Sequence, residues 1–362
     1  MSVAVITGSA GLVGSAVARF CVAQGMSVIG IDNHMRGEFF GPDASTRRNT
    51  DCLLRELPDY RHHDLDIRDR EGIEAVFAGY SDAISLVVHA AAQPSHDWAV
   101  RDPLTDFSVN ATGTLILLEA VRRHCPQSVF IYTSTNKVYG DAPNRLPLIE
   151  KETRWELAPD HPYADQGIDE EMSIDQSLHS IFGAGKLSSD IMTQEYGRYF
   201  GLKTGVFRCG CITGPHQTGA ELHGFLSWLV RCAVTRSPYV INGYGGKQVR
   251  DILHVSDLVQ AFRHFYQDPK PGAVYNMGGS RFNNCSVIEA IREIEEMSGY
   301  RPDLKLSDTP RIGDHIWWIS NVGRFRSDYP GWRPEYDLKA TLRELIDHHL
   351  ASDSSFSGNP PA

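Results

Sequence analysis

The sequence predicts an α/β fold, a doubly wound parallel sheet with a smaller C-terminal lobe. Short segments rich in β-branched residues alternate with helical segments as far as Arg208, and these apolar segments lack the in–out alternation of a half-exposed strand. Such strands are typical of a parallel sheet that helices cover on both faces. The alternation loosens after Arg208, which indicates a second lobe.

The N-terminal strand, turn and helix form the most informative segment of the chain. The strand 3–7 runs directly into three glycines, and the helix 12–23 follows. These glycines are Gly8, Gly11 and Gly14. Residues without a Cβ let the backbone approach a pyrophosphate, and the helix N-terminus presents free N–H groups to that anion. The segment therefore predicts a Rossmann-type site for a dinucleotide.

The second strand favours one dinucleotide over another. It spans 27–31 and ends at Asp32. A carboxylate at this point accepts hydrogen bonds from the adenosine ribose hydroxyls and repels a 2′-phosphate. We therefore expect the cofactor to be NAD rather than NADP.

The remaining elements divide the chain into two lobes. We expect strands at 60–63, 86–89, 129–132 and 204–207, and helices at 71–77, 105–124 and 180–200. Beyond these we expect helices at 222–235 and 288–297, with a return to the sheet through a strand at 273–276. This assigns residues 1–208 and about 239–278 to the NAD-binding lobe, and about 209–238 and 279–350 to the substrate-binding lobe. The tail 352–362 is mostly Ser, Gly and Pro, and we expect it to be disordered.

Composition limits the classes of partner. The chain has 362 residues, a formal net charge of −10 and no cluster of Lys and Arg, so neither nucleic acid nor an anionic membrane is an expected partner. No apolar run reaches transmembrane length and no secretion signal precedes the first strand, so we expect a cytoplasmic protein with its seven cysteines as free thiols. We expect no metal, because neither the pair Cys209 and Cys211 nor His62-His63-Asp64 has a second pair of ligands to complete a site.

Further motifs follow the glycine turn in order along the chain. They are Asp66-Ile67-Arg68, His89-Ala90-Ala91-Ala92, Asn110-Ala111-Thr112-Gly113-Thr114, the segment 132–140 and the segment 247–251. Together they resemble the extended short-chain dehydrogenase/reductases, the family of nucleotide-sugar epimerases and dehydratases, from residue 3 to about 335. Within that family, the segments 134–140 and 243–251 look most similar to those of the CDP-paratose 2-epimerases, also called CDP-tyvelose epimerases.

The resemblance implies a set of cofactor contacts. Asp66 and Ile67 would contact the adenine, and Lys186 would bind the nicotinamide ribose. The full set it implies, with the glycine turn and Asp32, is Gly8, Gly11, Leu12, Val13, Gly14, Asp32, Asn33, Asp66, Ile67, Ala90, Ala91, Ala92, Asn110, Thr133, Lys186 and Arg208.

The resemblance also implies a nucleotide-diphosphate sugar, CDP- or UDP-linked, as the substrate. Thr135 would bond the sugar oxygen that is oxidised, and Arg250 would bind the diphosphate with Arg311 as its partner. The implied substrate contacts are Gln93, Thr135, Asn136, Cys211, His223, Arg250 and Arg311.

One departure from the family pattern concerns catalysis directly. The family's catalytic tyrosine lies four residues before the lysine, and this chain has Phe182 there, which cannot exchange a proton. Three interpretations stay open. Another base replaces the tyrosine, with His179, Lys137 and Tyr163 as candidates; the reaction needs no strong base at that carbon; or the chain has kept the fold and lost catalysis.

The expected activity is an NAD-dependent epimerisation through a transient keto sugar, at C2 or at C4. The dehydratases of the family use an Asp-Glu pair where this chain has Asn136 and Lys137, so we place dehydratase below epimerase. The alternatives are a UDP-sugar 4-epimerase, a net dehydrogenase or dehydratase, and a catalytically silent NAD-binding protein. The resemblance further implies a homodimer that pairs through the helices 105–124 and 180–200.

Overall fold

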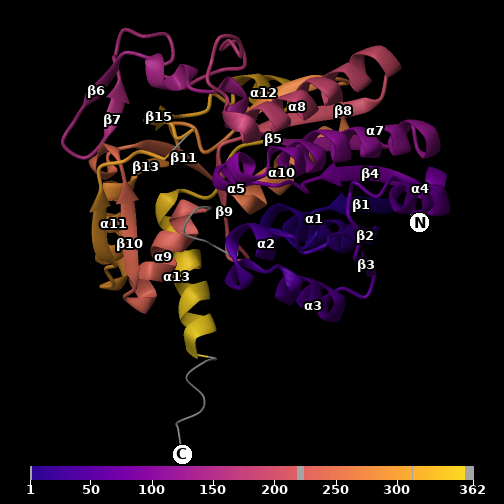
Figure 1. Ribbon diagram of the computed structural model, residues 1–362, viewed down its shortest axis with the longest axis horizontal. Coiled ribbons are helices and arrows are strands. Elements are labelled where there is room, and N and C mark those ends of the chain that lie inside the picture. The colour runs from indigo at the N-terminus through magenta and orange to yellow at the C-terminus, as the bar shows by residue number, and fades with distance from the viewer. Residues whose placement is uncertain (1, 218–223, 312, 355–362) are drawn as a thin grey trace, which may run out of the picture.

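A seven-stranded parallel sheet forms the centre of the larger lobe (Figure 1). The computed structural model describes residues 2–217, 224–311 and 313–354. The strands follow the order β12-β8-β5-β4-β1-β2-β3. Their bounds are β1 Val3–Thr7, β2 Ser27–Ile31, β3 Tyr60–His63, β4 Ile84–His89, β5 Val129–Thr135, β8 Lys203–Cys209 and β12 Ala273–Met277. The predicted fold class is confirmed, including the late return of the chain to the sheet through β12 at its edge.

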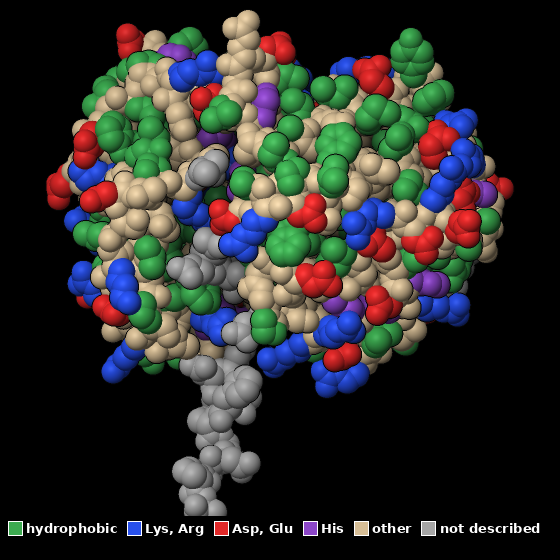
Figure 2. Space-filling view, viewed as in Figure 1, with side chains coloured by type: hydrophobic (Ala, Val, Ile, Leu, Met, Phe, Trp, Pro, Cys, Tyr) green, Lys and Arg blue, Asp and Glu red, His purple; other side chains and the backbone are tan. Residues whose placement is uncertain are grey.

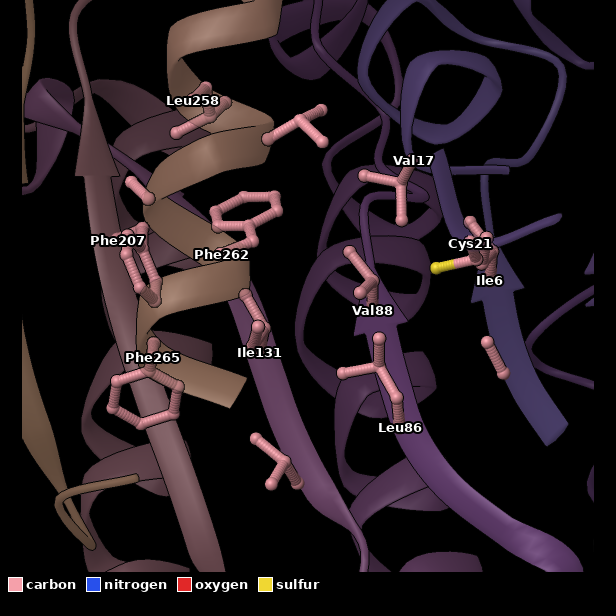
Figure 3. Close-up of a cluster of buried hydrophobic side chains, with 14 of the residues drawn as sticks. Ile6, Val17, Cys21, Leu86, Val88, Ile131, Phe207, Leu258, Phe262 and Phe265 are labelled. Atoms are coloured by element: carbon pink, nitrogen blue, oxygen red, sulfur yellow. The ribbon is translucent and has the colours of Figure 1, made fainter. Parts of the chain in front are cut away.

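Helices cover both faces of this sheet because its strands are apolar on both sides. Along β1, Val5 packs among α4, α7 and α8. Ile6 packs among α1 and α10 on the opposite face, which Figure 3 shows. The bounds on the first face are α4 Arg70–Tyr80, α7 Gly113–His124 and α8 Ser180–Phe200. Those on the second face are α1 Leu12–Ala23, α3 Arg47–Glu56, α10 Val255–Gln267 and α12 Gly323–Asp328. The sheet is therefore doubly wound, with one apolar core on each side.

The connections at the carboxyl ends of the strands contain more and shorter helices than predicted. The expected single helix 105–124 consists of α6 Pro103–Phe107, a π-helical turn Ser108–Thr112 and α7. The π turn places Asn110 where its side chain pairs with the backbone of Gln93, at 3.0 Å in both directions. Helices α2 Arg36–Phe40 and α5 His96–Arg101 also lie at this edge.

The smaller lobe has its own core, built from helices α9, α11 and α13 against β10 (Figure 1). The bounds are β9 Cys211–Thr213, α9 Phe225–Thr235, β10 Pro238–Asn242, β11 Val249–His254, β13 Asn284–Ser286, α11 Val287–Ser298, β14 Asp303–Ser307, β15 Trp317–Trp318 and α13 Leu338–Ser354, with a hairpin of β6 Leu148–Glu150 and β7 Trp155–Leu157. None of the described helices is long and apolar enough to cross a membrane.

Strand pairing, helix packing and the end of the last helix each differ at one point from the predicted division of the chain. Strand β10 pairs with β14, and β11 pairs with β9, β13 and β15, so residues 238–254 belong to the smaller lobe rather than to the sheet of the larger one. Helix α12 packs on the larger lobe, although β15 before it and α13 after it belong to the smaller lobe, because Phe325 inserts beside Phe207 of the central sheet. Helix α13 continues to Ser354, so the tail is helical over 352–354, and 355–362 lie outside the described residues.

Candidate active site

A cavity of about 500 Å³ runs along the carboxyl ends of the central strands and continues between the two lobes. On the face shown in Figure 2, a furrow separates these lobes. The predicted cofactor contacts that line the cavity are Gly8, Gly11, Leu12, Val13, Gly14, Asp32, Asn33, Asp66, Ile67, Ala90, Ala91, Ala92, Thr133 and Lys186. The predicted substrate and catalytic residues that line it are Thr135, Asn136, Lys137, Phe182, Cys211, Arg250 and Arg311.

The glycine turn forms a bare backbone surface at the N-terminus of α1. Gly8 has φ +66°, and a Cβ there would lie 2.6 Å from the backbone nitrogen of Ala91. A Cβ on Gly14 would lie 2.1 Å from the carbonyl oxygen of Gly8. Since the turn and the helix pack this closely, only glycine fits at Gly8 and Gly14, and the first residues of α1 line the cavity. This cradle fits the pyrophosphate of a dinucleotide.

Carboxylates shape the end of the cavity next to β2. Both oxygens of Asp32 already accept backbone hydrogen bonds, from the N–H of Ala10 at 3.1 Å and from that of His34 at 2.8 Å. Asp66 accepts from Asn33 at 3.0 Å and from Arg68 at 2.7 Å. Burial alone would raise the pKa of Asp66, but the hydrogen bonds from Arg68 outweigh it and lower that pKa. Both carboxylates are therefore held in fixed positions facing the cavity.

Lys186 and Thr135 both line the cavity. Helix α8 carries Lys186, whose Nζ donates to the carbonyl of Thr133 at 2.8 Å and lies 4.3 Å from the ring centre of Tyr132. Burial lowers the pKa of Lys186 to about 8. The hydroxyl of Thr135 accepts from the N–H of Lys137 at 3.2 Å, so it ends β5 and still lines the cavity.

Phe182 lies one helical turn before Lys186 and brings no polar atom to the cavity. It is buried, and the imidazole of His96 stands edge-on to it with the ring centres 4.8 Å apart. His96 also lines the cavity, and sequence reasoning missed it. The signal available was its place soon after β4, in the segment that follows the carboxyl end of a parallel strand.

A cluster of charged side chains closes the far end of the cavity. The Nη2 of Arg250 donates to the carboxylate of Asp314, and the Nζ of Lys137 lies 4.0 Å from the same carboxylate. Burial alone would raise the pKa of Asp314, but Arg250 and Lys137 hold it well below its usual value. Arg311 lines the cavity beside them. With three cations and one carboxylate, this end suits an anionic ligand.

Three predicted contact residues lie behind the cavity wall. Gln93 donates to Asp106 at 2.7 Å, and Asn110 donates to the same oxygen at 3.1 Å. The guanidinium of Arg208 forms two bonds with Asp190, at 2.9 and 3.0 Å, and one with Tyr139. These side chains are bonded within the protein and do not line the cavity, and the contacts of Gln93, Asn110 and Arg208 with a ligand stay predictions.

The structure does not bring the remaining candidates into the cavity. His179 precedes α8, and its Nε2 donates to the carbonyl of Ile174 at 2.7 Å. Neither His179 nor Tyr163 lines the cavity, and the ring of Tyr163 lies beside that of His161, with the ring centres 5.3 Å apart. His223 lies outside the described residues. No group of three or more His, Cys, Asp or Glu suited to a metal ion occurs in the described part of the chain.

The fold and the cavity together define a class of protein, a dinucleotide-binding α/β protein whose cavity extends to a cluster of charged side chains between its lobes. Residues 4–278 match the NAD dependent epimerase/dehydratase family, and the chain belongs to that family. NAD is accordingly the cofactor for which the glycine cradle is built.

Individual relatives extend over nearly the whole chain. The chain is 30% identical to the CDP-paratose 2-epimerase of Salmonella typhi over 94% of its own length and 97% of that protein. It is 26% identical to the dTDP-glucose 4,6-dehydratase of Salmonella typhimurium, covering 96% and 92% of the two chains. The structure of UDP-glucose 4-epimerase from Thermus thermophilus, a complex with NAD, superposes with a TM-score of 0.77 at 24% identity and covers 97% of this chain and 99% of that one.

Proposed function

We propose that the protein is an NAD-dependent nucleotide-sugar epimerase that acts through a transient keto sugar. The observation that carries this proposal is the continuity of one cavity. It joins the glycine cradle of α1 to the cations Arg250, Lys137 and Arg311, and Thr135 and Lys186 stand between the two ends. A nucleotide sugar bound with its diphosphate at the cations would thus present its sugar to Thr135.

The residues of the chain perform distinct tasks in this proposal. Arg250 binds the diphosphate, and Thr135 orients the sugar hydroxyl through its own hydroxyl. Lys186 holds the nicotinamide ribose and places a positive charge near the developing oxyanion. Bound NAD⁺ would supply the redox chemistry, the removal of a hydride from the ring carbon and its return to the other face of the sugar. The apolar ring of Phe182 keeps water from one side of the reacting carbon.

We favour a reaction like that of the CDP-paratose 2-epimerases, with a UDP-sugar 4-epimerase as the alternative. The 30% identity to a CDP-paratose 2-epimerase over nearly the full length of both chains supports the first. Dehydratase relatives are also similar, but Asn136 and Lys137 give this cavity an amide and a cation where elimination of water needs an acid and a base.

A homodimer is part of the proposal. Large apolar side chains are exposed on the outer face of α6, α7 and α8, among them Leu104, Leu115, Ile191 and Tyr199. Leu104 and Tyr199 are 84% and 83% exposed. A second copy of the chain that pairs through these helices would cover them, as expected for a two-fold symmetric interface.

Isotope labelling tests the proposed chemistry. The purified protein is incubated with CDP- and UDP-sugars that carry deuterium on the carbon to be epimerised. We expect epimerised product that retains the deuterium, without net consumption of NAD⁺, because the hydride does not leave the site. Exchange of the label with water would contradict the mechanism, net reduction of NAD⁺ would support a dehydrogenase, and no turnover across the panel would support a silent NAD-binding protein.

A further inference from the structure

His96 is the one histidine among the described residues that line the cavity, and the functions assigned above do not use it. It is the first residue of α5, which follows the loop from β4. Its ring lies against Phe182, with the ring centres 4.8 Å apart and the planes inclined by 62°. The imidazole therefore lies beside the position where the family resemblance places a phenol.

The surroundings of His96 hold the ring in one orientation. Its Nδ1 lies 3.1 Å from the Oγ of Ser180, and that oxygen also accepts from the N–H of Gly183 at 3.2 Å. Ser180 adopts φ +61°, a left-handed conformation that is unusual for a residue other than glycine, at the start of α8. Backbone strain of this kind persists only where the surrounding structure fixes it.

Space for the ring also depends on a glycine from the smaller lobe. Gly313 has φ +75°, and a Cβ on it would lie 2.9 Å from both Cε1 and Nδ1 of His96. The loop that carries Gly313 also carries Asp314, the partner of Arg250. The imidazole thus lies where the larger lobe meets the anion-binding end of the smaller one.

The second ring nitrogen of His96, Nε2, can accept a proton. In the tautomer that carries its hydrogen on Nδ1, this nitrogen donates to Ser180 and the Nε2 atom keeps a lone pair, and none of the described residues forms a hydrogen bond with Nε2. Burial first, and then the positive charges of Lys137 and Arg311, lower the pKa of His96 to about 3, and Asp314 acts in the opposite direction. The imidazole is therefore neutral at pH 7, as a proton acceptor must be.

The other titratable groups of the middle and far end of the cavity are less suited to accept a proton. Burial lowers the pKa of Lys137 and that of Lys186 to about 8, so both are cations at neutral pH. Burial raises the pKa of Cys211 to about 11, so it is a neutral thiol. Burial also raises the pKa of Tyr239 above its ordinary value, so it is a neutral phenol.

We propose that His96 is the proton acceptor of the reaction and replaces the tyrosine that Phe182 displaces, a role that rests on the proposed epimerase function. As the sugar is oxidised, its O–H bond breaks and the proton moves to Nε2 of His96. The C–H electron pair leaves with its hydrogen as hydride to the oxidised nicotinamide, and the C=O bond forms from the electrons of the O–H bond. In the return step the carbonyl carbon regains hydride on its other face, and the imidazolium returns the proton to oxygen.

Substrate binding would prepare the imidazole for this role. The two phosphates of a nucleotide sugar add negative charge next to Arg250 and Arg311, which offsets the cations that face His96. A nearby opposite charge shifts a pKa by about 1–3 units. We therefore expect the imidazole to become a stronger base only when the diphosphate is in place.

Nuclear magnetic resonance of the histidine rings tests this without any turnover. The NAD-loaded protein is titrated with acid before and after addition of CDP or UDP, and His96→Gln assigns the resonance. We expect the pKa of His96 to rise by at least about one unit with either diphosphate. An unchanged titration while the diphosphate is bound would overturn the proposal.

Kinetics give the second test. We expect His96→Asn to lower kcat by about 10²- to 10⁴-fold while NAD affinity and the melting temperature are kept. Adding Phe182→Tyr to His96→Asn should recover much of the loss, because it restores a phenol one turn before Lys186. Ser180→Ala removes the hydroxyl that positions the ring of His96, so it should displace the acidic limb of the dependence of kcat on pH, with a smaller loss of rate. This variant serves as the test if His96→Asn does not fold.

The outcomes separate the two proposals. Turnover of the unmodified protein that survives His96→Asn, or a loss at His179→Asn instead, refutes the role of His96 and leaves the epimerase function standing. No turnover of any nucleotide sugar by the unmodified protein refutes the function and, with it, this role.

Discussion

Arg250→Ala should weaken the binding of nucleoside diphosphates and leave NAD binding intact. The Nη1 of Arg250 donates to the carbonyl of Val249 at 2.8 Å and Nη2 donates to Asp314, so three of the five N–H groups of the guanidinium have no acceptor among the described residues. One hydrogen bond to a charged group contributes about 1.5–3 kcal/mol, which corresponds to a roughly 10- to 150-fold loss of affinity. The variant also leaves the Asp314 carboxylate facing the incoming anion, so we expect the upper part of that range.

Titration calorimetry with CDP and UDP on the NAD-loaded protein measures this loss. Arg292→Ala, on the exposed side of α11 in the same lobe, is the matched control and should bind both nucleotides as the unmodified protein does. Equal affinity of Arg250→Ala and the control for both nucleotides would refute the assignment of the diphosphate to this end of the cavity.

The same variant should also alter the dependence of stability on pH. Arg250 and Lys137 hold the pKa of Asp314 well below its usual value, so the folded protein keeps this carboxylate ionised where the unfolded chain binds a proton. The stabilisation is fully present above about pH 4 and is lost as the pH falls below that value. We therefore expect Arg250→Ala to lower the free energy of unfolding at neutral pH, with a smaller difference near pH 3. A difference that stays constant between these pH values in urea unfolding would contradict this account.

Three further predictions concern the cofactor and the assembly. Asp32→Ala should weaken NAD and relax the discrimination against NADP, as measured by fluorescence titration with both dinucleotides, and equal affinities in the unmodified protein would contradict the role of Asp32. Gly14→Ala should abolish NAD binding and lower stability by about 1–3 kcal/mol, because its Cβ would meet the carbonyl of Gly8 at 2.1 Å; a variant that binds NAD normally in calorimetry would show that the cradle tolerates a side chain. The protein should sediment as a dimer at micromolar concentration, and an unmodified protein that sediments as a monomer would contradict the proposed interface. Ile191→Asp combined with Tyr199→Asp should yield monomer, because the two substitutions place negative charge at exposed positions of that interface.

The predictable part of the fold depends on local chemistry. The bounds of β1, α1 and β2 match the sequence prediction. Glycine adopts the left-handed backbone conformation of position 8 without strain, and the strands β1 and β2 are continuously apolar, so both the turn and the strands can be read from neighbouring residues. The strand β12 could also be found from its own residues. The sheet to which β10 and β11 belong could not be predicted from their residues, because a short strand pairs as well with one sheet as with another. Only the tertiary contacts of the neighbouring segments decide which sheet it joins.

The candidate site divides in the same way. The sequence by itself determined the dinucleotide cradle, Asp32, and the spacing of Phe182 and Lys186 on one helix. Only the tertiary structure decided that His96 rather than His179 faces the cavity, and that Arg208 is bonded to Asp190 behind the wall. The physical reason is distance along the chain. The cradle depends on the backbone geometry of residues that are neighbours in the sequence. The middle of the cavity, by contrast, forms where α5, α8 and the loop at Asp314 meet. No local sequence pattern encodes which side chains of these three segments face one another.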